Sequence, residues 1–180
     1  MSRLEKTATA SMVVSFLLLA GITTRSFVLS RRPDPATVPL VKIGETVKLP
    51  GFSPGGARLT FVMVLSSQCP YCVHDLPFYR QLSALRASSA GELRLIAILP
   101  EKTASGAAFL RGSGVNTDDV LSMAPLELGV QLLPTLLLLD KNGKLEEYWA
   151  GEMDQARQQE VLAVLHASCG ACRLPVAAQR

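Results

Sequence analysis

The sequence contains few histidines, no internal repeat and, beyond residue 35, no excess of basic residues. Only two of its 180 residues are histidine, and no internal repeat is visible. The net charge of +3 comes from residues 1–35, which hold five basic residues against two acidic ones. The 13 basic and 13 acidic residues that follow cancel, so the folded part offers no basic face to a nucleic acid. We therefore expect no nucleic-acid partner.

Cysteine is also scarce, and the four cysteines form two pairs with two residues inside each pair. The pairs are Cys69 with Cys72 and Cys169 with Cys172, and 96 residues lie between them. That separation is far longer than the compact four-cysteine zinc pattern, so we expect no metal site. Paired cysteines are typical of an oxidising compartment outside the cytoplasm.

A long apolar run lies near the N-terminus. Residues 12–22 are apolar except for one serine, and residues 23–29 extend the run to the ~20 residues of a membrane span if Arg25 reaches the interface. A signal peptide cleaved near Ser30 is the alternative. We therefore expect residues 1–30 to be an N-terminal transmembrane or signal segment. An anchored, single-pass protein would face the periplasm or the exterior, and a cleaved one would be secreted or periplasmic.

The remaining residues predict one α/β domain. A proline-rich linker covers residues 31–40, the domain covers residues 41–168, and a tail with the second cysteine pair covers residues 169–180. Apolar runs predict strands at 41–50, 59–65, 92–99, 135–139 and 145–150. Helical spacing of apolar residues predicts helices at 73–87, 103–111 and 154–167, and a short turn is expected at 118–123. This order predicts a central mixed β-sheet flanked by helices.

The first cysteine pair lies where the strand at 59–65 gives way to a helix. Cys69, Pro70, Tyr71 and Cys72 follow one another there. The helix N-terminus stabilises a thiolate on Cys69, and Pro70 fits the first helical position because it has no N–H to leave unpaired. Cys72 lies one turn further on, where it can attack a mixed disulfide formed by Cys69. The spacing predicts a redox-active dithiol, with a structural disulfide as the alternative.

A second motif lies far downstream. Leu133 and Pro134 directly precede a fully apolar strand that begins at Thr135. Proline cannot donate a hydrogen bond to a central sheet, so Pro134 marks a turn or a cis peptide bond. A hairpin signal follows at residues 140–144. In this combination, with the cysteine motif opening a helix, the chain resembles the thioredoxin superfamily.

The resemblance covers residues 43–166 and is strongest to the membrane-anchored TlpA and ResA reductases and the related redoxin domains. It implies that Pro134 is cis and packs beside Cys69, and that the backbone of Leu133 pairs with an extended substrate segment. Pro70 and Tyr71 would also contact the substrate. The resemblance further implies protein thiols or disulfides as substrates, attachment to the membrane through the N-terminal helix, an upstream membrane electron donor and no bound cofactor.

Three features depart from the pattern of ordinary thioredoxins. Met63 stands on the strand where those proteins carry an acidic proton acceptor. Gln68 replaces the tryptophan that usually precedes the motif, and Pro70 with Tyr71 is the pair found in glutaredoxins. The direction of electron flow therefore stays open.

Two other functions compete with thiol–disulfide exchange. Ser66 lies three residues before Cys69, as in peroxiredoxin-like peroxide reductases, but the proline expected four residues before that hydroxyl is Val62. Copper delivery of the Sco type would use the first cysteine pair and a histidine. Neither His74 nor His166 lies in a distal loop, where that family places its ligand.

The second pair, Cys169 and Cys172, follows the last predicted helix. The negative end of the helix dipole disfavours a thiolate at this position. We expect either a local disulfide or an auxiliary redox pair that exchanges with the first pair. Two unpaired thiols are the remaining alternative.

Overall fold

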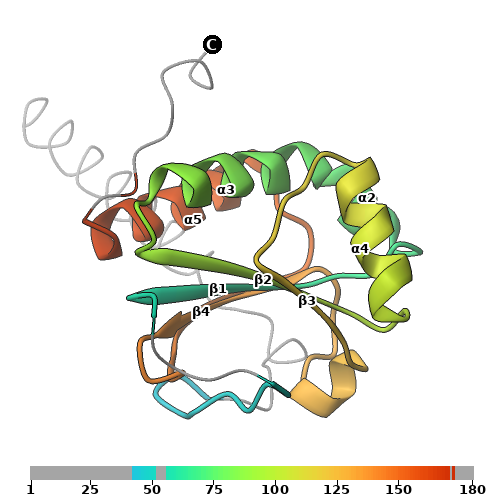
Figure 1. Ribbon diagram of the computed structural model, residues 1–180, viewed down its shortest axis with the longest axis horizontal. Coiled ribbons are helices and arrows are strands. Elements are labelled where there is room, and N and C mark those ends of the chain that lie inside the picture. Colours follow the sequence, from blue (N-terminus) through green and yellow to red (C-terminus); the bar gives the residue numbers. More distant parts are fainter. Residues whose placement is uncertain (1–41, 52–55, 171, 173–180) are drawn as a thin grey trace, which may run out of the picture. The chain divides into compact units, whose positions relative to one another are not determined.

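A five-stranded sheet forms the centre of the domain in the computed structural model, which describes residues 42–51, 56–170 and 172. The strands lie in the order β3-β2-β1-β4-β5 (Figure 1). Their bounds are β1 Leu59–Val64, β2 Leu93–Leu99, β3 Asp119–Ser122, β4 Thr135–Asp140 and β5 Leu145–Ala150. The helices are α2 Pro70–His74, α3 Leu76–Ser88, α4 Thr103–Gly112, the 3-10 helix η2 Pro125–Leu128 and α5 Gln155–Ser168.

The pairing of the central strand β1 determines which strand ends meet at the site. It runs parallel to β2, with Leu59 opposite Leu93, and antiparallel to β4, with Val64 opposite Thr135. The C-terminal end of β1 therefore meets the N-terminal end of β4. All six residues of β1 are buried because both faces of the sheet are covered.

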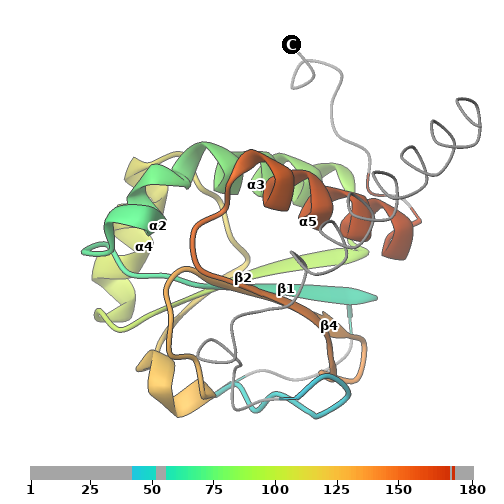
Figure 2. The ribbon, with the colours of Figure 1, turned by 180° about the vertical axis from the view of Figure 1, so that it is seen from behind.

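The two faces are covered in different ways. Helices α3 and α5 lie side by side on one face, where they pack on alternate β1 residues such as Phe61 and Met63 (Figures 1 and 2). On the other face, Val47 and Leu128 pack against Val62 from the segment 42–51 and the end of η2. The expected mixed sheet is confirmed, and the described α-helices that pack on its core lie on one face.

Two expected elements differ from the observed ones. The strand expected at 41–50 is limited, within its described part, to one isolated bridge between Thr46 and Lys144. The turn expected at 118–123 is the edge strand β3, in which Asp119 pairs in parallel with Ile96. Its side chains are only half-buried, so the run lacks the apolar pattern by which strands are recognised.

The helix expected at 73–87 is split at Asp75 into α2 and α3. Pro77 lies in the first turn of α3, where a missing N–H does no harm. The carbonyl of Asp75 instead accepts hydrogen bonds from the N–H groups of Phe78 and Tyr79, at 2.9 and 3.1 Å. The single helix expected there is therefore two helices, and α3 begins anew at Leu76.

The expected N-terminal segment 1–30 and linker 31–40 lie outside the described residues. Among the residues that are described, no helix combines the length and the apolar character needed to cross a membrane.

Candidate active site

The first cysteine pair lies just beyond the C-terminal end of β1. Leu65 still follows the sheet, because its N–H donates to the carbonyl of Ile98 at 2.9 Å. A short loop then brings Cys69 to the N-cap position of α2. There the sulfur of Cys69 accepts a hydrogen bond from the backbone N–H of Cys72 at 3.3 Å. A backbone donor aimed at this sulfur stabilises negative charge on it.

The two sulfurs have different environments. Both cysteines are free thiols, but Cys69 is half-buried whereas Cys72 is only 1% exposed. Burial raises the pKa of the Cys72 thiol, and the side chain of Cys69 and the negative charge of Asp75 raise it further. Cys69 is thus the sulfur that a partner can reach, and Cys72 stays protonated behind it.

Asp75 is a site residue that the sequence analysis missed. Its carboxylate is buried, with one oxygen accepting from the N–H of Met153 at 3.0 Å and the other 3.2 Å from Nδ1 of His74. Met63, where ordinary thioredoxins carry their acid, is fully buried in the core. The buried acid closest in sequence to the dithiol is therefore Asp75, between α2 and α3, and not a residue of strand β1. The sequence signal that could have identified Asp75 is its position between Cys72 and Pro77, close to the dithiol.

Tyr79 lies behind the same pair. Its hydroxyl is buried and has no hydrogen-bond partner within the described part of the chain. Burial raises the pKa of this phenol, and the nearby negative charge of Asp75 raises it as well. The tyrosine therefore remains neutral and contributes an apolar wall to the space behind Cys72.

Glu101 holds the loop that carries the reactive cysteine. One carboxylate oxygen accepts from the N–H of Ser67 at 2.7 Å, from its hydroxyl at 2.6 Å and from the hydroxyl of Ser66 at 3.0 Å. Partial burial raises the pKa of Glu101, but the hydrogen bonds from Ser67 and Ser66 outweigh it and lower the pKa overall. Sequence reasoning assigned Glu101 no role, since the contact joins residues 34 and 35 positions apart.

We predict that Glu101→Gln destabilises the domain at pH 7 by about 1–2 kcal/mol, because charge-assisted hydrogen bonds are lost. The folded-state pKa of Glu101 is depressed, so its stabilisation is present above the ordinary value of about 4.3 and disappears as the pH falls through the folded value. Urea unfolding at pH 7 and pH 3 measures this. Glu160→Gln, on the exposed surface of α5, is the control. An equal loss at both pH values would contradict the prediction.

Leu133 and Pro134 lie at the same end of the sheet as Cys69. The Leu133–Pro134 peptide bond is cis, as the resemblance implied. Pro134 is buried, and its carbonyl accepts from the N–H of Gly151 at 2.7 Å. Leu133 and Cys69 are half-buried and pack against the same core cluster. The structure therefore brings the two sequence motifs to one end of the sheet.

Apolar side chains surround this end. Tyr71 is 53% exposed, Val73 is 44% exposed and Leu132 is 39% exposed, and Pro70 is exposed beside them. Leu132 belongs to the loop before β4, and the other three belong to α2. The accessible sulfur of Cys69 is thus carried on an element that presents apolar groups to solvent.

The second pair is at the opposite end. Cys169 and Cys172 form a disulfide and are 1% and 3% exposed. The sulfur of Cys169 is 3.7 Å from Glu92, whose carbonyl accepts from the N–H of Leu59 at the start of β1. Six residues of strand, or roughly 20 Å, separate this position from the end of β1 that carries Cys69. Figure 1 shows α2 and the C-terminal end of α5 at opposite ends of the sheet.

The histidines are also far apart. His74 is exposed beside Asp75, whereas Nδ1 of His166 is 2.6 Å from the carbonyl oxygen of Cys172 at the far end. No group of three or more potential metal-ligating side chains occurs among the described residues.

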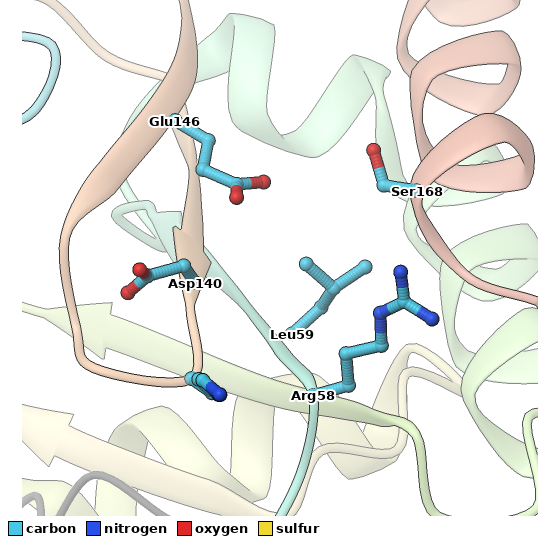
Figure 3. A pocket seen from close by; sticks show the side chains of 6 residues that line it. Arg58, Leu59, Asp140, Glu146 and Ser168 are labelled. Atoms are coloured by element: carbon cyan, nitrogen blue, oxygen red, sulfur yellow. The ribbon is translucent and has the colours of Figure 1, made fainter.

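A cavity of about 590 Å³ opens at the end of the sheet away from Cys69 (Figure 3). Its wall combines the start of β1, the turn between β4 and β5, and the last residue of α5. The lining residues are Arg58, Leu59, Asp140, Lys141, Glu146 and Ser168. The cavity contains neither cysteine pair, so it is separate from the candidate active site.

Comparison with solved structures identifies the fold. A protein assigned as the thiol:disulfide interchange protein DsbE from Chlorobium tepidum superposes with a TM-score of 0.58 at 21% identity, covering 72% of this chain and 99% of that one. A protein assigned as a disulfide isomerase from Bacteroides thetaiotaomicron gives 0.58 at 17%, covering 74% and 94%. A thiol-disulfide isomerase from Corynebacterium glutamicum gives 0.50 at 18%, covering 76% and 97%.

No protein-family model matches the chain, and no curated protein sequence matches it. The structural likeness shows that the chain has the thioredoxin-like fold, as its sequence resemblance implied.

Proposed function

We propose that the protein is a thiol–disulfide oxidoreductase that acts on protein disulfides through Cys69 and Cys72. The observation that carries this proposal is the asymmetry of the pair. The sulfur of Cys69 is accessible and receives a backbone N–H, while the thiol of Cys72 is buried directly behind it. The similar structures described as disulfide interchange proteins and isomerases support the same chemistry.

The reaction follows from this arrangement. The Cys69 thiolate attacks a substrate disulfide, forms a mixed disulfide and releases one substrate thiolate. Cys72 then loses its proton and attacks the Cys69 sulfur, which releases the second substrate thiolate and leaves a Cys69–Cys72 disulfide. Two electrons have passed to the substrate, and an external dithiol restores the pair. The same steps in reverse oxidise a substrate.

Substrate recognition is proposed for Leu133, Pro134, Pro70 and Tyr71. Leu133 and Pro134 directly precede β4 at the end of the sheet that carries Cys69, and the backbone there would pair with an extended segment of the substrate. Exposed apolar groups at Tyr71 and Leu132 favour a protein substrate with apolar residues near its cysteine. No bound cofactor is required, because the two cysteines supply and accept both electrons.

The cellular setting is proposed from the sequence. Residues 1–30 would anchor the protein in the membrane or direct its secretion, residues 31–40 would be the linker, residues 41–168 the redox domain and residues 169–180 the tail. The domain would then lie outside the cytoplasm and take electrons from an upstream membrane donor. The geometry favours neither peroxide reduction nor copper delivery: the Ser66 hydroxyl donates to Glu101, and His166 lies at the far end.

Reduction of insulin disulfides by dithiothreitol tests the function. We expect the wild-type chain to accelerate the reaction, and Cys169→Ala/Cys172→Ala to stay within about tenfold of wild type, equivalent to ~1.4 kcal/mol. Metal analysis of the same preparations tests the copper alternative. No acceleration by the wild type would reject the proposed function, and a larger loss in the variant would place the second pair in the catalytic cycle.

A further inference from the structure

The disulfide between Cys169 and Cys172 closes the end of the core. The N–H of Cys169 continues the helix by donating to the carbonyl of Leu165 at 2.9 Å. The carbonyl oxygen of Cys172 lies 2.6 Å from Nδ1 of His166. We call this closure, made of the disulfide and the contact with His166, the C-terminal clasp.

The clasp is part of the hydrophobic core. Cys169 and Cys172 belong to the same buried cluster as Leu85 of α3, Leu93 of β2 and Leu165 of α5. Both residues are at most 3% exposed. Cys169 and Cys172 thus pack beside the end of α5 and next to Glu92, which directly precedes β2, and the disulfide holds them there.

The surroundings of the clasp do not favour nucleophilic chemistry. A disulfide sulfur has no proton, so the 3.7 Å contact between Cys169 and Glu92 becomes a hydrogen bond only when the thiol forms. A thiolate there would face the carboxylate of Glu92 and the negative end of α5. The clasp is therefore poorly suited to pass electrons and also lies at the far end of β1 from Cys69.

We infer that the oxidation state of the C-terminal clasp controls the stability of the domain, independently of the proposed active site. In its oxidised form the clasp holds Cys169 and Cys172 in the core. A dithiol opens it by exchange: the Cys169–Cys172 bond breaks, both cysteines become thiols, and the dithiol becomes a disulfide. Opening frees the end of α5 and weakens the domain without changing the chemistry of Cys69.

The test uses Cys69→Ser/Cys72→Ser, because the clasp is then the remaining redox-responsive pair. We expect excess dithiothreitol to lower its melting temperature by about 5–10 °C, from the lost loop constraint and weaker packing. A variant with all four cysteines replaced, using alanine at 169 and 172, should melt at one temperature with and without reductant. Alkylation of the folded protein followed by mass spectrometry counts the thiols formed.

Hydrogen exchange locates the opening. On reduction, the amide of Cys169 should exchange at least tenfold faster, and its acceleration should exceed that of the amide of Leu65, which is bonded to Ile98 at the other end and responds only to the lower stability of the whole domain. A disulfide that dithiothreitol reduces only after the domain unfolds would overturn the inference. Two alkylated thiols with an unchanged melting temperature would also overturn it. Neither result depends on insulin reduction, so the outcome is separate from that of the proposed function.

Discussion

Cys72→Ser is expected to accumulate covalent adducts with substrate proteins through Cys69. In the wild type, the buried Cys72 thiol sits behind the Cys69 sulfur and resolves the mixed disulfide. Serine cannot make that attack, so the intermediate persists. Non-reducing electrophoresis of the reduced variant, incubated with native insulin whose disulfides are intact, should show adducts that disappear when a reductant is added.

Cys69→Ser is the matched control. It removes the accessible sulfur and should lower the rate of insulin reduction by at least about 10³-fold, equivalent to ~4 kcal/mol, with no trapped adducts. The roles would be reversed if Cys69→Ser formed the adducts, and adducts from neither variant beside an active wild type would reject both assignments.

Selective alkylation is the second large effect. At pH 7 we expect iodoacetamide to modify Cys69 in Cys72→Ser at least about 100-fold faster than Cys72 in Cys69→Ser. Cys69 is accessible and lies at a helix N-cap, whereas burial raises the pKa of Cys72 and shields its sulfur. Because only the thiolate reacts, the rate for Cys72 should still be rising at a pH where an ordinary thiol, with a pKa of about 8.5, has levelled off.

Asp75→Asn in the Cys69→Ser background refines this measurement. The carboxylate of Asp75 contributes to the raised pKa of Cys72, so its neutral amide should increase the alkylation rate of Cys72 near neutral pH. An amide oxygen can still accept from the N–H of Met153. An unchanged or slower rate, with the melting temperature preserved, would show that Asp75 does not act on this thiol.

The features that sequence reasoning predicted are those with a strong local signal. The apolar run of β1, the proline at the start of α2, and the Asp140–Gly143 turn before β5 each depend on residues close together in the chain. Pro134 could also be placed, because proline cannot donate to a central sheet. These local signals located both halves of the candidate site.

The features that were missed depend on contacts between distant residues. Asp75 bonds to Met153, 78 positions away, and Glu101 reaches back to Ser67 from the end of β2. Strand β3 is recognised by its pairing with β2. Its own residues give no strand signal, because most of their side chains are half-buried and two aspartates stand at its start. No pattern within a short window carries this information.

The placement of the two cysteine pairs at opposite ends of β1 gives the molecule four redox forms. With roughly 20 Å of packed strand between them, neither pair can draw electrons from the other within a folded chain. Each pair therefore equilibrates with its own external partner, so a reduced dithiol at Cys69 and Cys72 coexists with a closed clasp. Cys69 and Cys72 can therefore be reduced and ready for exchange while the disulfide that stabilises the domain stays intact.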